Sequence, residues 1–502
     1  MSIINFDDVC FTYAHTEEPA LDRINLSVTQ GEFFAVMGEN GAGKTTLCKL
    51  INGIIPHFSG GRLTGKVTVG GCDTGSSSVA ELSFKAGIVL DDPDAQLFTS
   101  SVRHEAAFGP ENMCLPREEI EERVKFALAA AGLDGFEDRL PSTLSGGEKQ
   151  RLSIAAALAM KSGILVLDEP LSRLDPEGAA RVMSVLNDIK IKYGITVVMA
   201  SHNSGLIAEY ADRVCILKNG RIAALERAEN IFLNLKLLEE NGIKPPEDKN
   251  NENFQNIFPE YPSSSGNPVI NIKNFCFRYS NGAVIENINL EIYDNDFISL
   301  MGSNGCGKTT LLKNITGLLR PSSGDIFIHG KNTRELSVGG ISEEIGFVMQ
   351  NPDTQLFTDT VFNEAAFALK NMLVETHQGK RRRLSKSEIK QRVEDALAAV
   401  NLRSADAFPF ALSRSDRTKT VIACVLAMGT RIILFDEVDV GNDYKSSLEI
   451  MNTAKNLHSK GYTIIFVTHN ISLARDYAHR LVIMDRSGIV FDGKREAESH
   501  SI

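Results

Sequence analysis

The chain has 502 residues, 43% of them apolar, and a formal net charge of −11. This length is sufficient for several domains with their own hydrophobic cores. The acidic balance argues against a broad nucleic-acid surface, because contacts with phosphates need a basic face. The 8 cysteines are scattered singly, without disulfide or metal-ligand spacing, and indicate reduced thiols. No apolar run reaches the length of a membrane-spanning helix, so none is expected.

Several segments of the first half return in the second half in the same order. They are GENGAGKTTL (38–47) and GSNGCGKTTL (302–311), DPDAQLFT (92–99) and NPDTQLFT (351–358), LVLDE (165–169) and ILFDE (433–437), and SHN (201–203) and THN (468–470). We therefore predict one domain type that occurs twice, in residues 1–243 and 268–502. The intervening stretch, 244–267, is rich in Pro, Asn and Ser and predicts a linker.

Within each half, apolar runs such as FFAVMG (33–38) alternate with helical patterns such as EEIEERVKFALAAAG (118–132). This alternation predicts an α/β fold with a mainly parallel sheet covered by helices. Glycine-rich turns follow some of the strands at their carboxyl ends. Ligands of open α/β sheets bind at that edge.

A strand, a glycine loop and a helix follow one another in both halves, which is the context that a GxxxxGKT phosphate loop requires. The glycines let backbone N–H groups surround the phosphates, the lysine reaches the β and γ phosphates, and the following threonine binds Mg²⁺. ATP and Mg²⁺ are therefore the expected ligands. The nucleotide-binding candidates are Gly38, Asn40, Gly41, Gly43, Lys44, Thr45 and Thr46 in the first half, and Gly302, Asn304, Gly305, Gly307, Lys308, Thr309 and Thr310 in the second. Cys306 lies in the second loop and is expected to be only a small residue that fits there.

An apolar strand that ends in Asp-Glu follows each loop. In isolation this pair would be read as a solvated strand end, but after a phosphate loop it is typical of nucleotide hydrolysis. We expect Asp168 and Asp436 to hold Mg²⁺ together with Thr45 and Thr309, and the glutamates that follow to polarise the attacking water. These catalytic candidates are Glu169 and Glu437.

Two further residue types recur at matching places. His202 and His469 each follow another apolar strand, which predicts a position near the γ-phosphate as hydrogen-bond partners rather than as metal ligands. Tyr13 and Tyr279 precede the phosphate loops and are candidates to stack on adenine, although an aromatic residue in a strand is usually part of the core.

The segment LSGGEKQR (144–151), with the phosphate loop, the Asp-Glu strand and the later histidine, resembles the nucleotide-binding domains of ATP-binding-cassette proteins. The resemblance covers nearly the whole chain outside the linker. It implies two tandem P-loop NTPase domains, each with a mainly parallel sheet core, an antiparallel β subdomain and a helical subdomain. It also implies a head-to-tail pair in which each ATP lies between the phosphate loop of one half and the LSGGE segment of the other.

The chemistry of the LSGGE segment fits a phosphate contact. Ser145 is expected to cap a helix, and Glu148 to complete a capping box. Gly146 and Gly147 have no side chain to prevent a close approach of the backbone to the γ-phosphate.

A narrower resemblance, to the ATPases of energy-coupling-factor importers, is carried by QNPDTQLF (350–357), TVFNEAAF (360–367) and the helical tail AENIFLNLKLLEENGIKPP (228–246). It implies an ATPase that energises vitamin or transition-metal uptake. The implied partners are integral membrane subunits, namely a transmembrane coupling protein and a substrate-binding subunit, and the implied location is the cytoplasmic face of the cell membrane. Coupling segments of these partners are expected near Gln96 and Gln355.

Three alternatives remain open at this point. The chain also fits a fused ATPase of a sugar or nucleoside importer, a soluble fused-cassette translation factor, and a nucleotide-sensing module without turnover. The sugar or nucleoside importer ranks second, because its pattern does not require the NPDxQLF segment that is repeated in this chain. The translation factor is disfavoured because its class has a long, charged helical linker between the domains, whereas the linker here is short. The basic run GKRRRLSK (379–386) is predicted to be a solvated insertion rather than a binding site.

The second half departs from the family pattern at the signature segment. LSRSDRTKT (412–420) stands there, with Ser413 as the expected helix start and Arg414 in place of a glycine. The first half departs too, since Asp91 stands where the second half has Gln350, a residue that the family uses to meet the metal and the γ-phosphate.

The loops after the two glutamates also differ, VDVGND (438–443) against PLSRLD (170–175). By the family geometry, all three departures fall on the site built around Lys44. The other site combines Lys308, Thr309, Gln350, Asp436, Glu437 and His469 with Ser145, Gly146 and Gly147, and keeps the family pattern. We therefore predict an asymmetric ATPase in which the Lys308 site hydrolyses ATP and the Lys44 site retains it.

Overall fold

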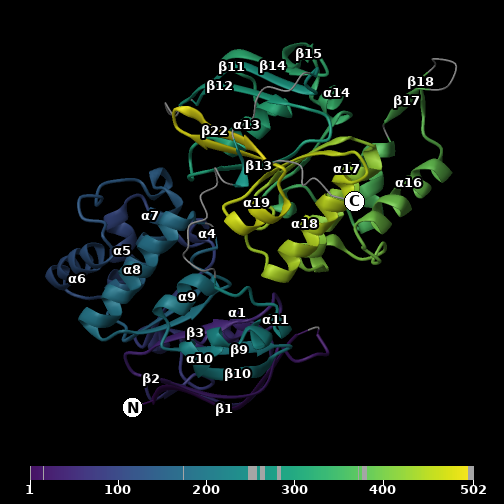
Figure 1. Ribbon diagram of the computed structural model, residues 1–502. Coiled ribbons are helices and arrows are strands. Elements are labelled where there is room, and N and C mark those ends of the chain that lie inside the picture. Colours follow the sequence, from purple (N-terminus) through teal and green to yellow (C-terminus); the bar gives the residue numbers. More distant parts are fainter. Residues whose placement is uncertain are drawn as a thin grey trace. The chain divides into compact units, whose positions relative to one another are not determined.

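The computed structural model describes residues 2–14, 16–172, 174–246, 257–259, 266–279, 284–370, 372–375 and 381–495. The chain forms two compact units, of which the first comprises residues 1–249 and 443–445 and the second comprises 250–442 and 446–502. In Figure 1 the first unit runs mostly from purple through blue to teal, and the second mostly from teal-green to yellow. Within the described residues, every helix is too short or too polar to span a lipid bilayer.

A six-stranded sheet in the order β10-β9-β3-β8-β7-β6 forms the centre of the first unit. Neighbouring strands are parallel except β9 and β10. Every residue of β3, β7 and β8 is buried, which explains why their sequences are continuously apolar instead of alternating. The strands are β3 (Phe33–Met37), β6 (Ala86–Val89), β7 (Ile164–Asp168), β8 (Thr196–Ala200), β9 (Arg213–Lys218) and β10 (Arg221–Arg227).

A second, antiparallel sheet of the first unit has the order β2-β1-β4-β5. Burial alternates along β2, as expected for a sheet with one face in the core and one in solvent. One core joins this sheet to the six-stranded sheet and includes Phe11, Leu47 and Val198. The strands are β1 (Ser2–Tyr13), β2 (Leu21–Thr29), β4 (Gly61–Val69) and β5 (Cys72–Asp73).

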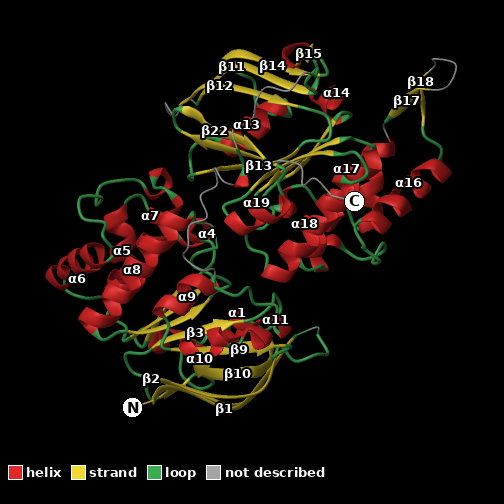
Figure 2. Ribbon diagram, in the orientation of Figure 1, coloured by secondary structure: helices red, strands yellow, loops and turns green. Residues whose placement is uncertain are grey.

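The helices α1 and α2 pack in the core between the two sheets, whereas α5 to α11 pack in a core on the other face of the six-stranded sheet. Figure 2 shows α5, α6 and α7 gathered away from the strands β1 and β2. A second core joins these helices to the sheet and includes Leu128, Leu158 and Leu165. The helices are α1 (Lys44–Ile51), α2 (Ile54–His57), α3 (Val79–Ser83), α4 (Pro93–Gln96), α5 (Val102–Asn112), α6 (Arg117–Ala130), α7 (Gly146–Ala159), α8 (Pro176–Tyr193), α9 (Ser204–Tyr210), α10 (Ala228–Leu233) and α11 (Leu235–Glu240).

The sheets of the second unit repeat this architecture, with the orders β16-β19-β20-β13-β21-β22 and β12-β11-β14-β15. The six-stranded sheet contains β13 (Phe297–Gly302), β16 (Ile345–Val348), β19 (Ile432–Asp436), β20 (Thr463–Val467), β21 (Arg480–Asp485) and β22 (Gly488–Lys494). The antiparallel sheet contains β11 (Ile270–Arg278), β12 (Val284–Ile292), β14 (Ser323–Ile328) and β15 (Lys331–Asn332).

The helices of the second unit include a set that lies beside the six-stranded sheet, as in the first unit. They are α13 (Lys308–Ile315), α14 (Val338–Ser342), α15 (Val361–Phe367), α16 (Lys386–Ala399), α17 (Arg414–Met428), α18 (Tyr444–His458) and α19 (Ile471–Tyr477). The predicted fold class is confirmed, because each unit has a mainly parallel sheet, an antiparallel sheet and a helical subdomain.

Two segments outside the motifs have a structural role in the second unit. A hairpin of β17 (Leu373–Glu375) and β18 (Arg381–Arg383) precedes α16, and Arg382 forms an exposed ion pair with Glu388 at 2.5 Å. The part of the basic run that the structure describes is thus solvated, as predicted. Most of the predicted linker lies outside the described residues, but Phe258 within it is fully buried in the second unit's core.

Candidate nucleotide-binding and hydrolysis sites

The first phosphate loop connects β3 to α1 and depends on glycine at several positions. Gly38 has φ +146°, and a Cβ there would lie 2.2 Å from the carbonyl oxygen of Leu217. Gly43 has φ +105°, and a Cβ there would lie 2.7 Å from the carbonyl oxygen of Ala20. Both distances are shorter than any van der Waals contact, so a side chain at either position would displace the loop.

The second phosphate loop, between β13 and α13, has the same conformation. Gly302 has φ +151° and Gly307 has φ +107°, close to the values of the matching residues in the first loop. A Cβ on the central glycine of either loop, Gly41 or Gly305, would meet nothing within 4 Å. The backbone is therefore open at the centre of each loop, where the predicted phosphate contacts would form.

The loop lysines lie at the start of the helices and turn back onto their loops. Lys44 Nζ donates to the carbonyl oxygens of Gly38 at 3.0 Å and Glu39 at 3.2 Å. Lys308 Nζ donates to the corresponding carbonyls of Gly302 at 2.9 Å and Ser303 at 3.1 Å. Both side chains are buried, and burial lowers the pKa of Lys44, while the Glu169 carboxylate opposes this effect.

Each loop threonine forms a hydrogen bond with an aspartate at the end of a sheet strand, which is β7 in the first unit and β19 in the second. Thr45 Oγ1 donates to Asp168 Oδ1 at 3.1 Å, and Thr309 Oγ1 donates to Asp436 Oδ1 at 3.0 Å. Burial raises the pKa of Asp168, and it raises that of Asp436 to about 6. A hydroxyl beside a buried carboxylate fits Mg²⁺, which prefers oxygen ligands and would restore the charged form of the aspartate.

In the first unit, Glu169 and His202 form a compact group with Lys44. His202 Nε2 lies 3.1 Å from Glu169 Oε1 and 3.0 Å from Lys44 Nζ, and the His202 N–H donates to Glu169 Oε2 at 3.2 Å. His202 Nε2 also lies 3.1 Å from Asn40 Oδ1. Burial, with a smaller effect of Lys44, lowers the pKa of His202 to about 3, so the imidazole is neutral at physiological pH.

In the second unit, the corresponding glutamate has an additional partner. Glu437 Oε1 lies 3.1 Å from His469 Nε2 and 3.9 Å from Lys308 Nζ. Glu437 Oε2 accepts a hydrogen bond of 2.9 Å from Gln350 Nε2. The structure therefore brings Lys308, Gln350, Glu437 and His469 together at one edge of the sheet.

The matching position in the first unit is Asp91, whose side chain has no N–H to donate to the glutamate. Burial, with smaller contributions from the nearby Asp168 and Asp91 carboxylates, raises the pKa of Glu169 to about 7 against the opposing effect of Lys44. The substitution of a carboxylate for an amide thus changes the electrostatics around the first glutamate.

The two signature positions both start a helix, as predicted. Ser145 caps α7, and a capping box with Glu148 is complete, with the Ser145 N–H donating to Glu148 Oε2 at 2.7 Å. Ser413 caps α17, where its Oγ accepts from the Asp416 N–H at 3.1 Å. The helix start is confirmed in both halves, although the second half has lost the glycines.

The predicted adenine-stacking tyrosines are held by threonines of the phosphate-loop helices. Tyr13 Oη lies 3.0 Å from Thr46 Oγ1, and Tyr279 Oη lies 2.8 Å from Thr310 Oγ1. Each ring packs edge-on against the phenylalanine two residues before it. The sequence predicted that these rings stack on adenine, but it did not predict their hydrogen-bond partners. The second threonine of the GKTT motif, which occurs in both halves, was the signal that could have identified these partners.

Gln96 and Gln355 use their amides within their own units. Gln96 Nε2 donates to the Ile88 carbonyl at 3.1 Å, and its Oε1 accepts from the Leu90 N–H at 3.1 Å. Gln355 makes the matching bonds to Phe347 and Met349, at 2.9 and 2.8 Å. These side chains therefore fix the strand ends.

A buried glutamate in each half was missed by the sequence analysis. Glu105 Oε2 accepts from the N–H groups of Phe98 and Thr99, and Glu364 Oε2 accepts from those of Phe357 and Thr358. The recurrence of Glu before Ala-Ala-Phe in both halves was the signal that could have revealed it. Asp439 was also missed, and it accepts a 2.7 Å hydrogen bond from Thr468 Oγ1, next to His469.

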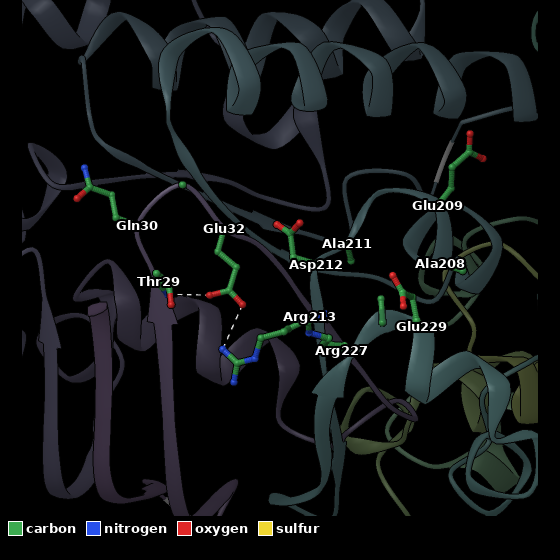
Figure 3. A pocket seen from close by; sticks show the side chains of 12 residues that line it. Thr29, Gln30, Glu32, Ala208, Glu209, Ala211, Asp212, Arg213, Arg227 and Glu229 are labelled. Atoms are coloured by element: carbon green, nitrogen blue, oxygen red, sulfur yellow. Dashed lines mark hydrogen bonds and ion pairs between the residues drawn. The ribbon is translucent and has the colours of Figure 1, made fainter. Parts of the chain in front are cut away.

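A polar pocket of about 570 Å³ lies at the other edge of the first unit's sheet, where β2 leads into β3 (Figure 3). Glu32 in this pocket accepts from the Thr29 N–H at 2.7 Å and from Arg213 Nη1 at 3.1 Å. Asp212 accepts from the Phe33 N–H at 2.7 Å. Because these charged groups satisfy one another, we assign them a structural role at the start of β3.

The fold and the geometry of the two loops define a P-loop ATPase with two nucleotide-binding domains in one chain. The model of the ABC transporter family matches residues 21–172 and 285–439. The chain therefore belongs to the ABC transporter family, as a tandem ATPase that binds ATP, normally with Mg²⁺, and hydrolyses it.

Similar proteins carry names of the same kind. One from Caldanaerobacter subterraneus subsp. tengcongensis, provisionally named an ABC transporter ATP-binding protein, is 36% identical over 97% of this chain and 90% of its own length. One from Methanosarcina mazei, with the same name, is 34% identical over 98% of this chain and 89% of its own. The solved structure of cbiO1 from Clostridium perfringens, described as part of the ABC transporter complex cbiONQ, is 33% identical, covers 48% of this chain and 94% of its own, and has a TM-score of 0.43.

Proposed function

We propose that this chain is the ATP-hydrolysing subunit of a membrane importer of the energy-coupling-factor type, which takes up a vitamin or a transition-metal ion. We further propose that hydrolysis takes place mainly at the Lys308 site. The observation that carries the asymmetry is the hydrogen bond of 2.9 Å from Gln350 Nε2 to Glu437 Oε2. The Asp91 side chain has no amide N–H with which to donate the corresponding bond to Glu169.

At the Lys308 site, the residues divide the work of hydrolysis. Lys308 is expected to leave the loop carbonyls and donate to the β and γ phosphates of ATP, as a point charge that stabilises the negative charge developing on them. Glu437 would accept a hydrogen bond from the attacking water and orient it, while Gln350 and His469 hold the carboxylate from two sides.

Bound Mg²⁺, held by Thr309 and Asp436, supplies positive charge that neutralises the phosphate oxygens. The family resemblance implies that Ser145, Gly146 and Gly147 of the first half provide the remaining contacts to the γ-phosphate. The capping box of α7 supports this assignment, because it leaves the first backbone N–H groups of the helix available.

At the Lys44 site, the groups needed for binding are retained. Gly41, Lys44 and Thr45 match the residues of the second loop in position, and Asp168 is paired with Thr45 in the same way. The departures affect groups that would act on the transition state, namely Asp91 and Arg414. Removal of one preorganised donor commonly costs about 10²- to 10³-fold in rate, or about 3 to 4 kcal/mol. We therefore propose that this site retains ATP and turns it over slowly.

The type of importer is proposed from three segments, 228–246, 350–357 and 360–367. The segment 228–246 includes the short helices α10 and α11, the segment 350–357 lies between β16 and α15, and the segment 360–367 forms α15 with its N-cap Thr360. The partners would be a transmembrane coupling protein and a substrate-binding subunit. The chain would act as a peripheral subunit at the cytoplasmic face of the membrane.

The asymmetry is tested by two matched substitutions in the full-length chain assembled with its membrane partners. Glu437→Gln should reduce steady-state ATP turnover about 10²-fold or more, whereas Glu169→Gln should leave most of it. Glu177→Gln, at an exposed position of α8, is the control and should change nothing. Equal losses for the first two variants would refute the asymmetric assignment.

The importer type is tested by the proteins that co-purify with the chain from detergent-solubilised membranes. A coupling protein together with a small substrate-binding membrane protein is expected, and uptake of the substrate should require ATP. Sugar or nucleoside permease subunits would place the chain in that importer class instead, and association with ribosomes would contradict the transport assignment altogether.

A further inference from the structure

Arg414, the residue that replaces a signature glycine in the second half, lies against the hydrolysis machinery of its own unit. It is the first residue of α17 and is half-buried. Its Nη2 donates a hydrogen bond of 3.1 Å to the carbonyl oxygen of Gln350, which is the residue whose side chain holds Glu437. Two consecutive hydrogen-bonded contacts thus connect Arg414 to the proposed catalytic glutamate.

The guanidinium of Arg414 also packs against the loop that follows Glu437. A Cβ on Gly441 would lie 3.1 Å from Arg414 Cζ and 3.2 Å from its Nε. Gly441 has φ +75°, a conformation that favours glycine, and a side chain there would also have to displace the Arg414 guanidinium by a few tenths of an ångström. The arginine occupies the space that the glycine leaves.

The first half has the reverse arrangement of the same two residue types. Gly146 stands at the signature position, and among the described residues a Cβ there would meet Leu174, at 3.8 Å. Arg173, which lies outside the described residues, stands in the sequence where the second half has Gly441. The first half thus has glycine in the signature segment and arginine in the loop after the glutamate, whereas the second half has arginine in the signature segment and glycine in that loop. This exchange is the pattern expected of compensating substitutions rather than of random loss.

A contact shared by both halves shows what is new in the second. Arg417, one turn after Arg414 on α17, binds Asp353 at 2.7 Å, and Lys149 on α7 binds Asp94 at 2.5 Å in the matching place. The loop after β16 is therefore held at Gln350 as well as at Asp353. The added bond at Gln350 comes from a planar, permanently charged donor, which is stronger than a neutral one.

We propose that Arg414 is a positioning residue for the Lys308 site: it fixes the Gln350 backbone so that the Gln350 amide holds Glu437 in place. The substitution that removes the signature in the second half thereby supports hydrolysis within the same unit. This inference rests on the proposed function, since it assumes that the Lys308 site is the one that hydrolyses ATP.

The test compares Arg414→Gly, Arg414→Ala and Arg414→Lys in the full-length chain. The first variant restores a glycine of the family signature, so the reading of Arg414 as mere decay predicts unchanged or increased turnover. The positioning role predicts that kcat falls about tenfold in the glycine and alanine variants, in line with the loss of one charged hydrogen bond, while KM for ATP is unchanged. The lysine variant should recover part of the rate, because it keeps a donor without the planar fork.

A double-mutant cycle separates positioning from general damage. In a Gln350→Ala background the amide that Arg414 positions is gone, so Arg414→Ala should have little further effect on kcat. Independent losses that simply multiply would overturn the proposal. Circular dichroism melts of each variant confirm that the helix and the fold are retained.

Amide hydrogen exchange supplies a readout that does not depend on turnover. In Arg414→Ala, exchange in residues 349–355 should become several-fold faster, while the matching loop of the first unit, residues 90–96, is unchanged. Unchanged exchange in 349–355 overturns the proposal, and so does a loss of ATP retention without a change in kcat, which would indicate a nucleotide contact instead. If Glu437→Gln retains turnover, the proposed function has failed. If Glu437→Gln abolishes turnover and Arg414→Ala does not change it, only the positioning role has failed.

Discussion

The nucleotide-free protein should become more stable at alkaline pH when Glu169 is replaced by glutamine. Glu169 lies among Lys44, His202 and Asp168 with 17% of its side chain exposed, and burial raises its pKa to about 7 from 4.5. The folded state thus binds a proton more tightly than the unfolded chain does. Stability therefore falls as the pH rises from about 4.5 to about 7, and it stays at the lower level above that range.

The magnitude follows from the two pKa values. A tenfold difference in proton affinity is worth about 1.4 kcal/mol, so the full penalty of ionising Glu169 in the folded state is about 3 kcal/mol. About 1 kcal/mol of it is present at pH 5 and nearly all of it at pH 8. Since glutamine resembles the protonated form, the gain from Glu169→Gln should be about 2 kcal/mol greater at pH 8 than at pH 5.

Thermal unfolding without nucleotide or Mg²⁺ measures this difference. For a domain of this size, about 2 kcal/mol corresponds to a shift of about 4 to 8 °C in the first unit's transition. Glu81→Gln is a control of opposite sign, because hydrogen bonds from Ser78 lower the pKa of this exposed carboxylate in its capping box, so its replacement should give no gain at pH 8. An equal shift at both pH values for Glu169→Gln would refute the reasoning.

Three further predictions concern contacts that the structure revealed. Tyr279→Phe and Thr310→Val should each raise the KM for ATP by a similar factor, about three- to tenfold, because both remove the same 2.8 Å hydrogen bond. The double variant should show no larger increase in KM than either single variant, and additive effects in ATP titrations would contradict this. Glu364→Gln should lower the unfolding free energy by about 1 to 3 kcal/mol in urea denaturation, since an amide cannot accept from both backbone N–H groups at one charged oxygen equally well, and an unchanged midpoint would count against it. Arg480→Ala should cost about 3 to 5 kcal/mol, because it removes the 3.1 Å ion pair of the buried Asp296 carboxylate and leaves only the more distant Lys494 ammonium, at 3.7 Å, as an ionic partner among the described residues. A melting shift under about 3 °C would show that the pair is not important.

The sequence by itself determined those features that depend on neighbouring residues and on short-range periodicity. The phosphate loops could be predicted because the glycines, the lysine and the threonine lie within one strand-loop-helix unit. The start of α17 at Ser413 could be predicted because a cap depends on a serine and the residues directly after it. The fold class followed from apolar runs alternating with helical patterns, and from their repetition along the chain.

The tertiary structure alone decided which distant residues meet and in which direction their side chains extend. Gln350 and Glu437 lie far apart in the sequence, and their hydrogen bond exists because β16 and β19 are neighbours in the sheet. The sequence showed Arg414 only as a residue that stands in place of a signature glycine. Its actual contacts with Gln350 and Gly441 depend on three loops that the sheet brings together, and no local pattern encodes the direction of a long, flexible side chain.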